Sequence, residues 1–148
     1  MELPEFDDGA YSTGTAPFSN GTGPGIYTPA TYWPENTKLI VRVRFNVPGL
    51  PASAHLGFGI DNEVDLFING VAVGTGALSG PGCGGCWPAD YGNYTLPIPD
   101  GVLQPGENLL VALAKDLGGN TALDLSITAD LATKTAGATW GKLKSIYR

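Results

Sequence analysis

Three carboxylates that could bind a cation recur at alternate positions in the middle of the chain, Asp61, Glu63 and Asp65. Alternate residues of an extended strand point to the same side. With Asn62 beside them, these side chains could supply the oxygen ligands that calcium prefers. The other interpretation is that they form the wet face of a strand whose intervening residues are apolar. We expect no required cofactor, and structural calcium is the one candidate.

Cys83 and Cys86 have the Cys-x-x-Cys spacing of redox and zinc sites. A redox pair places its first thiol at a helix N-terminus, and the surrounding glycines predict no helix here. Zinc takes four ligands, whereas the chain holds 2 cysteines and a single histidine, His55. We therefore expect a local disulfide that stiffens a loop, with free thiols as the alternative. A disulfide would imply an oxidising environment.

Aromatic residues near this loop are the candidate binding surface. Exposed rings stack on the apolar faces of sugars and also anchor protein interfaces. The alternative is that the rings fill one end of the hydrophobic core. The residues expected to contact a carbohydrate or a protein partner are Trp87, Tyr91 and Tyr94 near the loop, together with Trp33, which would approach it if the arm folds back.

Catalysis is not expected from this set of side chains. His55 is the single histidine, and the chain has no Gly-x-Ser-x-Gly turn, phosphate-binding loop or dinucleotide fingerprint. No second carboxylate cluster has a spacing that indicates glycoside hydrolysis. We therefore predict that the protein is not an enzyme.

Charge is distributed unevenly along the 148 residues, which carry 14 acidic and 8 basic side chains and a net charge of -6. Four of the basic residues and no acid lie in the last sixteen, so the body is about −10 and the tail +4. An acidic body repels nucleic acid and anionic membranes. No stretch approaches the ~20 apolar residues of a membrane span, and the first residues do not resemble a signal peptide. We expect no nucleic-acid partner and no membrane insertion.

The basic tail, residues 132–148, is predicted to be a short helical or extended segment that docks on a neighbour. Its apolar residues recur at helical spacing after Thr139, a candidate N-cap. Two or three helical turns are unstable alone in water, and a solvated tail is the alternative. The expected assembly contacts are Trp140, Lys142, Leu143, Lys144, Ile146, Tyr147 and Arg148.

The elements that must position these residues are short strands, because 22 glycines and 12 prolines leave little room for helices. Residues 1–36 lack a sustained period, and we expect an extended arm with one strand near 25–32. Aromatic side chains would pin this arm onto a sheet or onto a neighbouring subunit. These side chains are Phe6, Tyr11, Phe18, Tyr27, Tyr32 and Trp33.

Residues 37–131 are predicted to form one antiparallel β-sandwich domain. Apolar and polar residues alternate in several runs, as expected for strands with one buried and one wet face. Asn69-Gly70 is a strong hairpin signal, because both central residues of a type I′ turn need positive φ. The run 109–114 is apolar on both faces and should be central, and residues 74–92 are expected to be mainly loop. The strands are expected at 38–47, 56–60, 64–68, 71–73, 94–98, 109–114 and 123–129.

Two of these runs carry a resemblance to a known family. Residues 58–74 hold an acidic strand that leads into Asn-Gly, and residues 103–113 hold Pro-Gly-Glu-Asn before an apolar strand. In this order they resemble the galactose-binding-like jelly-roll domains, over about residues 38–130. The resemblance implies a jelly-roll sandwich of a carbohydrate-binding or adhesion module, and many members carry structural calcium. Both motifs mark turns, so they indicate the fold and do not identify a ligand.

Two functional hypotheses follow. The first is a structural protein of a homo- or hetero-oligomeric assembly that grips neighbours through its arm and tail. A virion decoration protein, fibre or tail component, or a subunit of an extracellular layer, would fit. The second is a carbohydrate-binding module of a larger secreted protein, with glycans as partners. Both place the chain on a virion surface or outside the cell.

Overall fold

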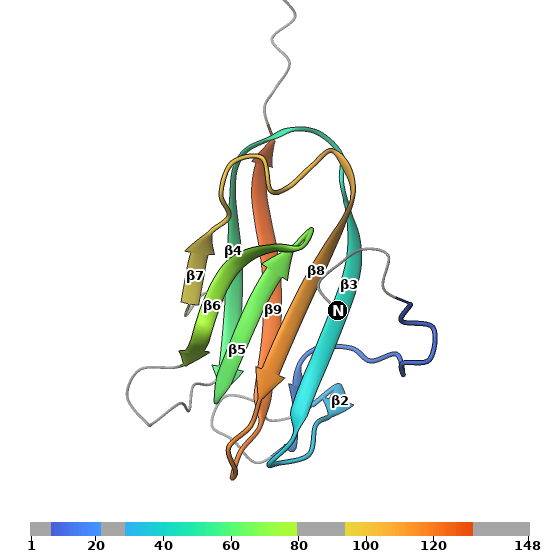
Figure 1. The fold of residues 1–148 in the computed structure, drawn as a ribbon, viewed down its shortest axis with the longest axis vertical. Coiled ribbons are helices and arrows are strands. Elements are labelled where there is room, and N and C mark those ends of the chain that lie inside the picture. Colours follow the sequence, from blue (N-terminus) through green and yellow to red (C-terminus); the bar gives the residue numbers. More distant parts are fainter. Residues whose placement is uncertain (1–6, 22–28, 80–93, 132–148) are drawn as a thin grey trace, which may run out of the picture.

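Two β-sheets packed face to face make up the fold (Figure 1). This computed structural model describes residues 7–21, 29–79 and 94–131, which are all-β and contain no helix. The strands are β1 (Phe18–Ser19), β2 (Thr31–Tyr32), β3 (Lys38–Val47), β4 (Pro51–Asp61), β5 (Glu63–Ile68), β6 (Val71–Ser79), β7 (Tyr94–Pro97), β8 (Gly106–Lys115) and β9 (Ala122–Leu131).

The two sheets interleave strands from both ends of the chain. One sheet has the order β2-β1-β9-β4-β7 and the other has the order β3-β8-β5-β6. Apart from the short parallel pair of β1 with β2, the strand pairs are antiparallel. The last strand, β9, therefore lies inside its sheet, between β1 and β4.

The core lies between the sheets and is built from alternate residues of the long strands. On β4 and β9, Phe58 pairs with Leu125 and Ile60 pairs with Leu123, so these side chains share the inner face. Burial of such apolar side chains supplies most of the driving force for folding. The side chains with no exposed surface include Leu56, Ile60, Leu66, Ile68, Val111, Ala112 and Leu123.

The alternating runs of the sequence predicted the strands well. The runs 38–47 and 64–68 form β3 and β5, and Asn69 and Gly70 have φ of 52° and 79°, as a type I′ hairpin requires. The run 109–114 lies in β8, between β3 and β5, which confirms that this strand is central. A strand with two apolar faces is buried by its neighbours, and that burial explains its composition.

Two expectations about irregular segments need correction. Residues 74–79 were expected in a loop, but β6 continues to Ser79 because it pairs with β5 as far as Glu63. Residues 18–19, expected in an irregular part of the arm, form strand β1, whereas strand β2 at 31–32 lies within the strand expected near 25–32. Phe18 and Trp33 of this stretch are buried in the core. Hydrophobic burial therefore attaches the arm to the sandwich at Phe18 and Trp33.

The two motifs behind the family resemblance meet in one polar cluster, the turn cluster, formed by Asn69, Val102, Gln104, Asn108 and Leu109. The Asn69 side chain accepts a hydrogen bond from the Leu109 N–H at 2.9 Å and donates to the Asn108 carboxamide at 2.8 Å. It also donates to the Val102 carbonyl at 2.8 Å. Asn108, which is 1% exposed, also accepts from the Gln104 N–H at 2.9 Å and donates to its carbonyl at 2.8 Å.

Candidate functional site

A groove of about 960 Å³, which we call the β3–β9 groove, is hollowed into one side of the sandwich. Its walls are residues 39–45 of β3 and residues 125–127 of β9, with contributions from β1, β2 and β8. Arm residues between Asp8 and Ala16 also line it, and in Figure 1 the arm runs on the side of the sandwich where β3 lies. Ligand pockets typically measure roughly 300–1,000 Å³, so the volume is sufficient for a sugar chain or an extended peptide.

Two strand edges border this groove. On the β1 side of β9, only Leu123 and Ala122 have partners among the described strands. Within the described residues, β3 pairs with β8 alone, so its other edge is open along ten residues. Open edges present backbone N–H and C=O groups that can pair with an added strand. The groove therefore offers two edges suited to strand addition.

Arg42 and Asp8 form the principal ion pair of the groove. The Arg42 Nε donates to a carboxylate oxygen of Asp8 at 3.0 Å, with side-chain exposures of 6% and 40%. This hydrogen bond lowers the pKa of Asp8 below its usual value, and the positive charges of Arg42 and Arg44 act in the same direction against a smaller opposing effect of burial. Asp8 is therefore held as a carboxylate, and it fixes one end of the arm.

Exposed apolar side chains gather at the same place. Tyr11, Tyr32 and Val43 line the groove and are 50%, 67% and 43% exposed. Arg44 lies on the same wall and forms an exposed ion pair with Glu107 at 3.3 Å. An exposed pair of this kind contributes about 0–1 kcal/mol. The rings and the two arginines form a mixed apolar and cationic surface suited to binding.

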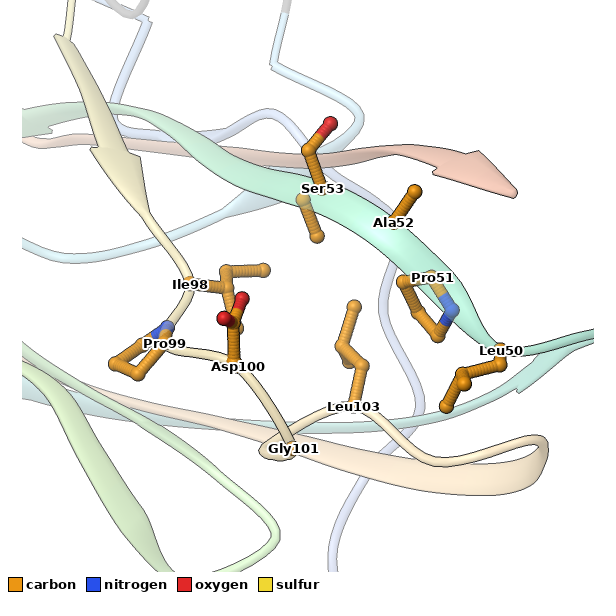
Figure 2. Close-up of a pocket in the computed structure, with 10 residues that line it drawn as sticks. Leu50, Pro51, Ala52, Ser53, Ile98, Pro99, Asp100, Gly101 and Leu103 are labelled. Atoms are coloured by element: carbon orange, nitrogen blue, oxygen red, sulfur yellow. The ribbon is translucent and has the colours of Figure 1, made fainter. Parts of the chain in front are cut away.

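A second, smaller hollow of about 230 Å³ lies at the start of β4 (Figure 2). Its walls are residues 50–54 of the chain, residues 98–101 of the following turn, and Leu103. Figure 2 shows Asp100 and Leu103 pointing from that turn toward β4. The Ser53 hydroxyl donates to Asp130 at 2.9 Å, so it is already engaged. The volume is below the range usual for ligand pockets, and we favour the β3–β9 groove.

The three carboxylates considered for calcium do not lie on one strand. Asp61 is the last residue of β4 and pairs with Ala122 in the five-stranded sheet, whereas Glu63 begins β5 in the other sheet. Glu63 forms an ion pair with Lys115 at 3.6 Å. Among the described residues, no group of three or more His, Cys, Asp or Glu side chains is arranged to hold a metal ion. The change of sheet at Asn62 separates them.

Two of the aromatic residues predicted to bind a partner face the core. Trp33 is 1% exposed, and its indole N–H donates to the Thr37 hydroxyl at 2.9 Å. Tyr94 is half-buried and stacks on Phe58, with ring centroids 5.2 Å apart. For Trp33 the expectation of a surface ring needs correction, because its burial leaves no face for a ligand. Its burial agrees with the alternative interpretation, in which the Trp33 ring fills part of the hydrophobic core.

The remaining predicted site residues lie outside the described parts of the chain. They are Trp87 and Tyr91, the cysteines Cys83 and Cys86, and the tail residues Trp140, Lys142, Leu143, Lys144, Ile146, Tyr147 and Arg148. The disulfide and the docking tail stay predictions.

Asp8 and Arg42 were not singled out from the sequence as site residues. They lie 34 residues apart, and Arg42 belongs to the run 38–47, which was predicted as a strand with one buried and one wet face. The signal available was the pair of exposed arm tyrosines, since Tyr11 and Tyr32 were expected to pin the arm to a sheet or a neighbour. Both line the groove, where they stay half or more exposed.

The chain matches no family model, no curated protein and no solved structure in the comparisons made. Over residues 7–21, 29–79 and 94–131 there is no helix with the length and apolar character of a membrane span. The function is therefore argued from the groove and its side chains.

Proposed function

We propose that this protein is a non-catalytic β-sandwich of a larger assembly, which attaches to neighbouring proteins through its arm, its basic tail and the β3–β9 groove. The observation that carries this proposal is the groove itself. It has two open strand edges, an arm anchored by the Asp8–Arg42 ion pair, and the exposed side chains of Tyr11, Tyr32 and Val43. Aromatic residues and arginine are enriched where proteins bind one another.

We also propose the jelly-roll, galactose-binding-like class for the fold. With β2 set aside, the strands form four nested antiparallel pairs, β5 with β6, β4 with β7, β3 with β8 and β1 with β9. Eight strands in two sheets are the content of a jelly roll, a class that includes viral capsid and lectin domains. This class supports a location on a virion surface or outside the cell.

A second candidate function, carbohydrate binding, is favoured by the two exposed tyrosines. Sugar rings stack on aromatic faces, and Tyr11 and Tyr32 line the groove beside hydroxyl side chains such as Ser12, Thr13 and Ser126. In this candidate function the carbohydrate binds in the groove and does not contact Trp33.

Size-exclusion chromatography with light scattering, run beside a glycan array, separates the two candidates. The assembly proposal expects self-association or particle binding and a silent array. The carbohydrate-binding module would be supported instead by a monomer that binds one class of sugar. The Tyr11→Ala, Tyr32→Ala double variant should then no longer bind that sugar. The matched control is Leu50→Ala, since Leu50 is 60% exposed and lies outside the groove.

The tail is tested by deleting residues 133–148. The assembly proposal expects weaker attachment and an unchanged melting temperature for the sandwich. Attachment that stays at full strength after this deletion, and also after the Tyr11→Ala, Tyr32→Ala change, would contradict the proposal.

A further inference from the structure

The small hollow at the start of β4 has the size and chemistry of a pocket for one side chain. Its volume of about 230 Å³ is below the range of pockets that take whole ligands. The walls are largely apolar, with Leu50, Pro51 and Leu103 among them, and the Asp100 side chain points from the turn toward β4 (Figure 2). A lysine side chain matches this arrangement, because its hydrocarbon stem packs on apolar surface while its ammonium group stays in contact with water.

The charge of this pocket is negative. Asp100 lines it together with Ser53, whose hydroxyl donates to the Asp130 carboxylate on the neighbouring strand at 2.9 Å. Within the described parts of the chain, no Lys or Arg side chain lines the pocket, and all of them belong to β3 or β8. A basic side chain from another segment would therefore complement the charge of Asp100.

The chain carries such a side chain soon after β9. Leu131, the last residue that the structure describes, pairs with Pro51 of the pocket wall. Figure 1 shows β9 ending at the same end of the sandwich as the turn before β4 and the turn after β7. Neighbouring strands lie about 5 Å apart. Lys134 comes three residues after Leu131, a separation that spans at most about 10 Å. Lys134 is therefore within reach of the pocket of its own copy.

We infer that the pocket at the start of β4 holds the Lys134 side chain of the same copy, with its ammonium group against the Asp100 carboxylate. The occupant is the beginning of the basic tail, residues 132–148, which carries Lys and Arg but no acid. Leu50 and Leu131 are 60% and 42% exposed, so this end also offers apolar surface to the tail. A segment tethered beside its binding site is present there at a high effective concentration. The inference goes beyond the proposed assembly function, because the contact forms within one copy.

Trypsin cleavage after Lys134 tests this contact, because trypsin must take that side chain into its own specificity pocket. In the full chain, cleavage after Lys134 should be slower in the parent than in an Asp100→Asn variant, by about two- to fivefold for an exposed ion pair. The matched control is Glu35→Gln, which removes one exposed negative charge that does not line the pocket. Equal rates after Lys134 in the parent and in Asp100→Asn would overturn the inference.

Carbodiimide cross-linking of the unmodified protein identifies which copy supplies the lysine. The reagent joins a carboxylate to an amine as an amide and takes up the water that is released, so a bound Lys134 should be linked to Asp100. In a mixture of ¹⁵N-labelled and unlabelled copies, contact within one copy predicts linked peptides of a single isotope content. The control is Lys134→Arg, which keeps the charge but has no amine, and it should lose the link. Linked peptides of mixed isotope content would overturn the inference.

The inference and the proposed function fail separately, because neither of these measurements needs a partner. Attachment that is lost on deletion of residues 133–148, together with cleavage after Lys134 that ignores Asp100→Asn, would support the assembly and contradict the pocket contact. A protected Lys134 in a chain that never self-associates and binds no protein particle would support the pocket contact and contradict the assembly.

Discussion

The turn cluster and the β3–β9 groove differ in how far their side chains are buried and bonded within the sandwich. In the turn cluster, the Asn69 and Asn108 carboxamides donate to and accept from groups of the same chain, and Asn108 is almost completely buried. In the groove, two tyrosines and a valine remain exposed beside an arginine pair. The hydrogen bonds of the turn cluster are made within one copy of the chain. The groove, in contrast, has exposed side chains that a partner could contact. Stability should therefore reside in the cluster and binding in the groove.

The largest expected effect is the loss of Asn108. In an Asn108→Ala variant the Gln104 N–H and the Asn69 carboxamide lose a buried acceptor, and leaving such groups unsatisfied should lower the free energy of unfolding by about 2–4 kcal/mol. Urea denaturation measures it. The matched groove variant, Tyr32→Ala, should change the same quantity by less than about 0.5 kcal/mol. Equal losses in the two variants would remove the distinction between the regions.

A smaller loss is expected at the hairpin turn that carries Asn69. Gly70 has φ of 79°, which a residue with Cβ adopts at a cost, so Gly70→Ala should destabilise the protein by about 1–2 kcal/mol. Gly49→Ala is the control, because a Cβ at Gly49 has nothing within 4 Å and its φ is not positive. Thermal unfolding of both variants measures the difference. A Gly70→Ala melting temperature equal to that of the control would show that the turn tolerates a side chain.

The contact between Asp8 of the arm and Arg42 of the groove should depend on pH. Because the folded state lowers the pKa of Asp8 from 3.8, the arm contact is fully present above about pH 4 and is lost as the pH falls through the lower folded value. Carboxyl NMR shifts of Asp8 should follow this titration, with faster amide exchange in the arm at the acid end. In Asp8→Asn the arm should exchange rapidly at every pH. An Asp8 that titrates at or above its ordinary value would contradict the contact with Arg42.

The smallest expected effect is that of calcium removal. Asp61, Glu63 and Asp65 belong to two sheets, and Lys115 already neutralises Glu63. Excess chelator should therefore leave the melting temperature unchanged within error. A clear fall, reversed by added calcium and absent in Asp65→Asn, would support the calcium hypothesis.

The strands could be predicted from the sequence, but the groove could not. Alternation along β3 and the Asn69-Gly70 signal are local features, so they identified a strand and a hairpin directly. The groove depends on which edges meet, and Asp8 reaches Arg42 across 34 residues. The break between the strands expected at 56–60 and 64–68 was predicted, but the sequence did not indicate that these strands belong to different sheets, so Asp61, Glu63 and Asp65 were considered as one group. Contacts between distant segments were the missing information.

The place of β9 inside its sheet has a consequence for synthesis of the chain. Strands β1 and β4 are made early, yet each pairs with β9, the last strand that the structure describes. The five-stranded sheet cannot assemble until residues 122–131 have left the ribosome, and loop closure over such distances is slow. Until then the nascent chain exposes apolar strands with unpaired edges, which is the kind of surface that leads to aggregation.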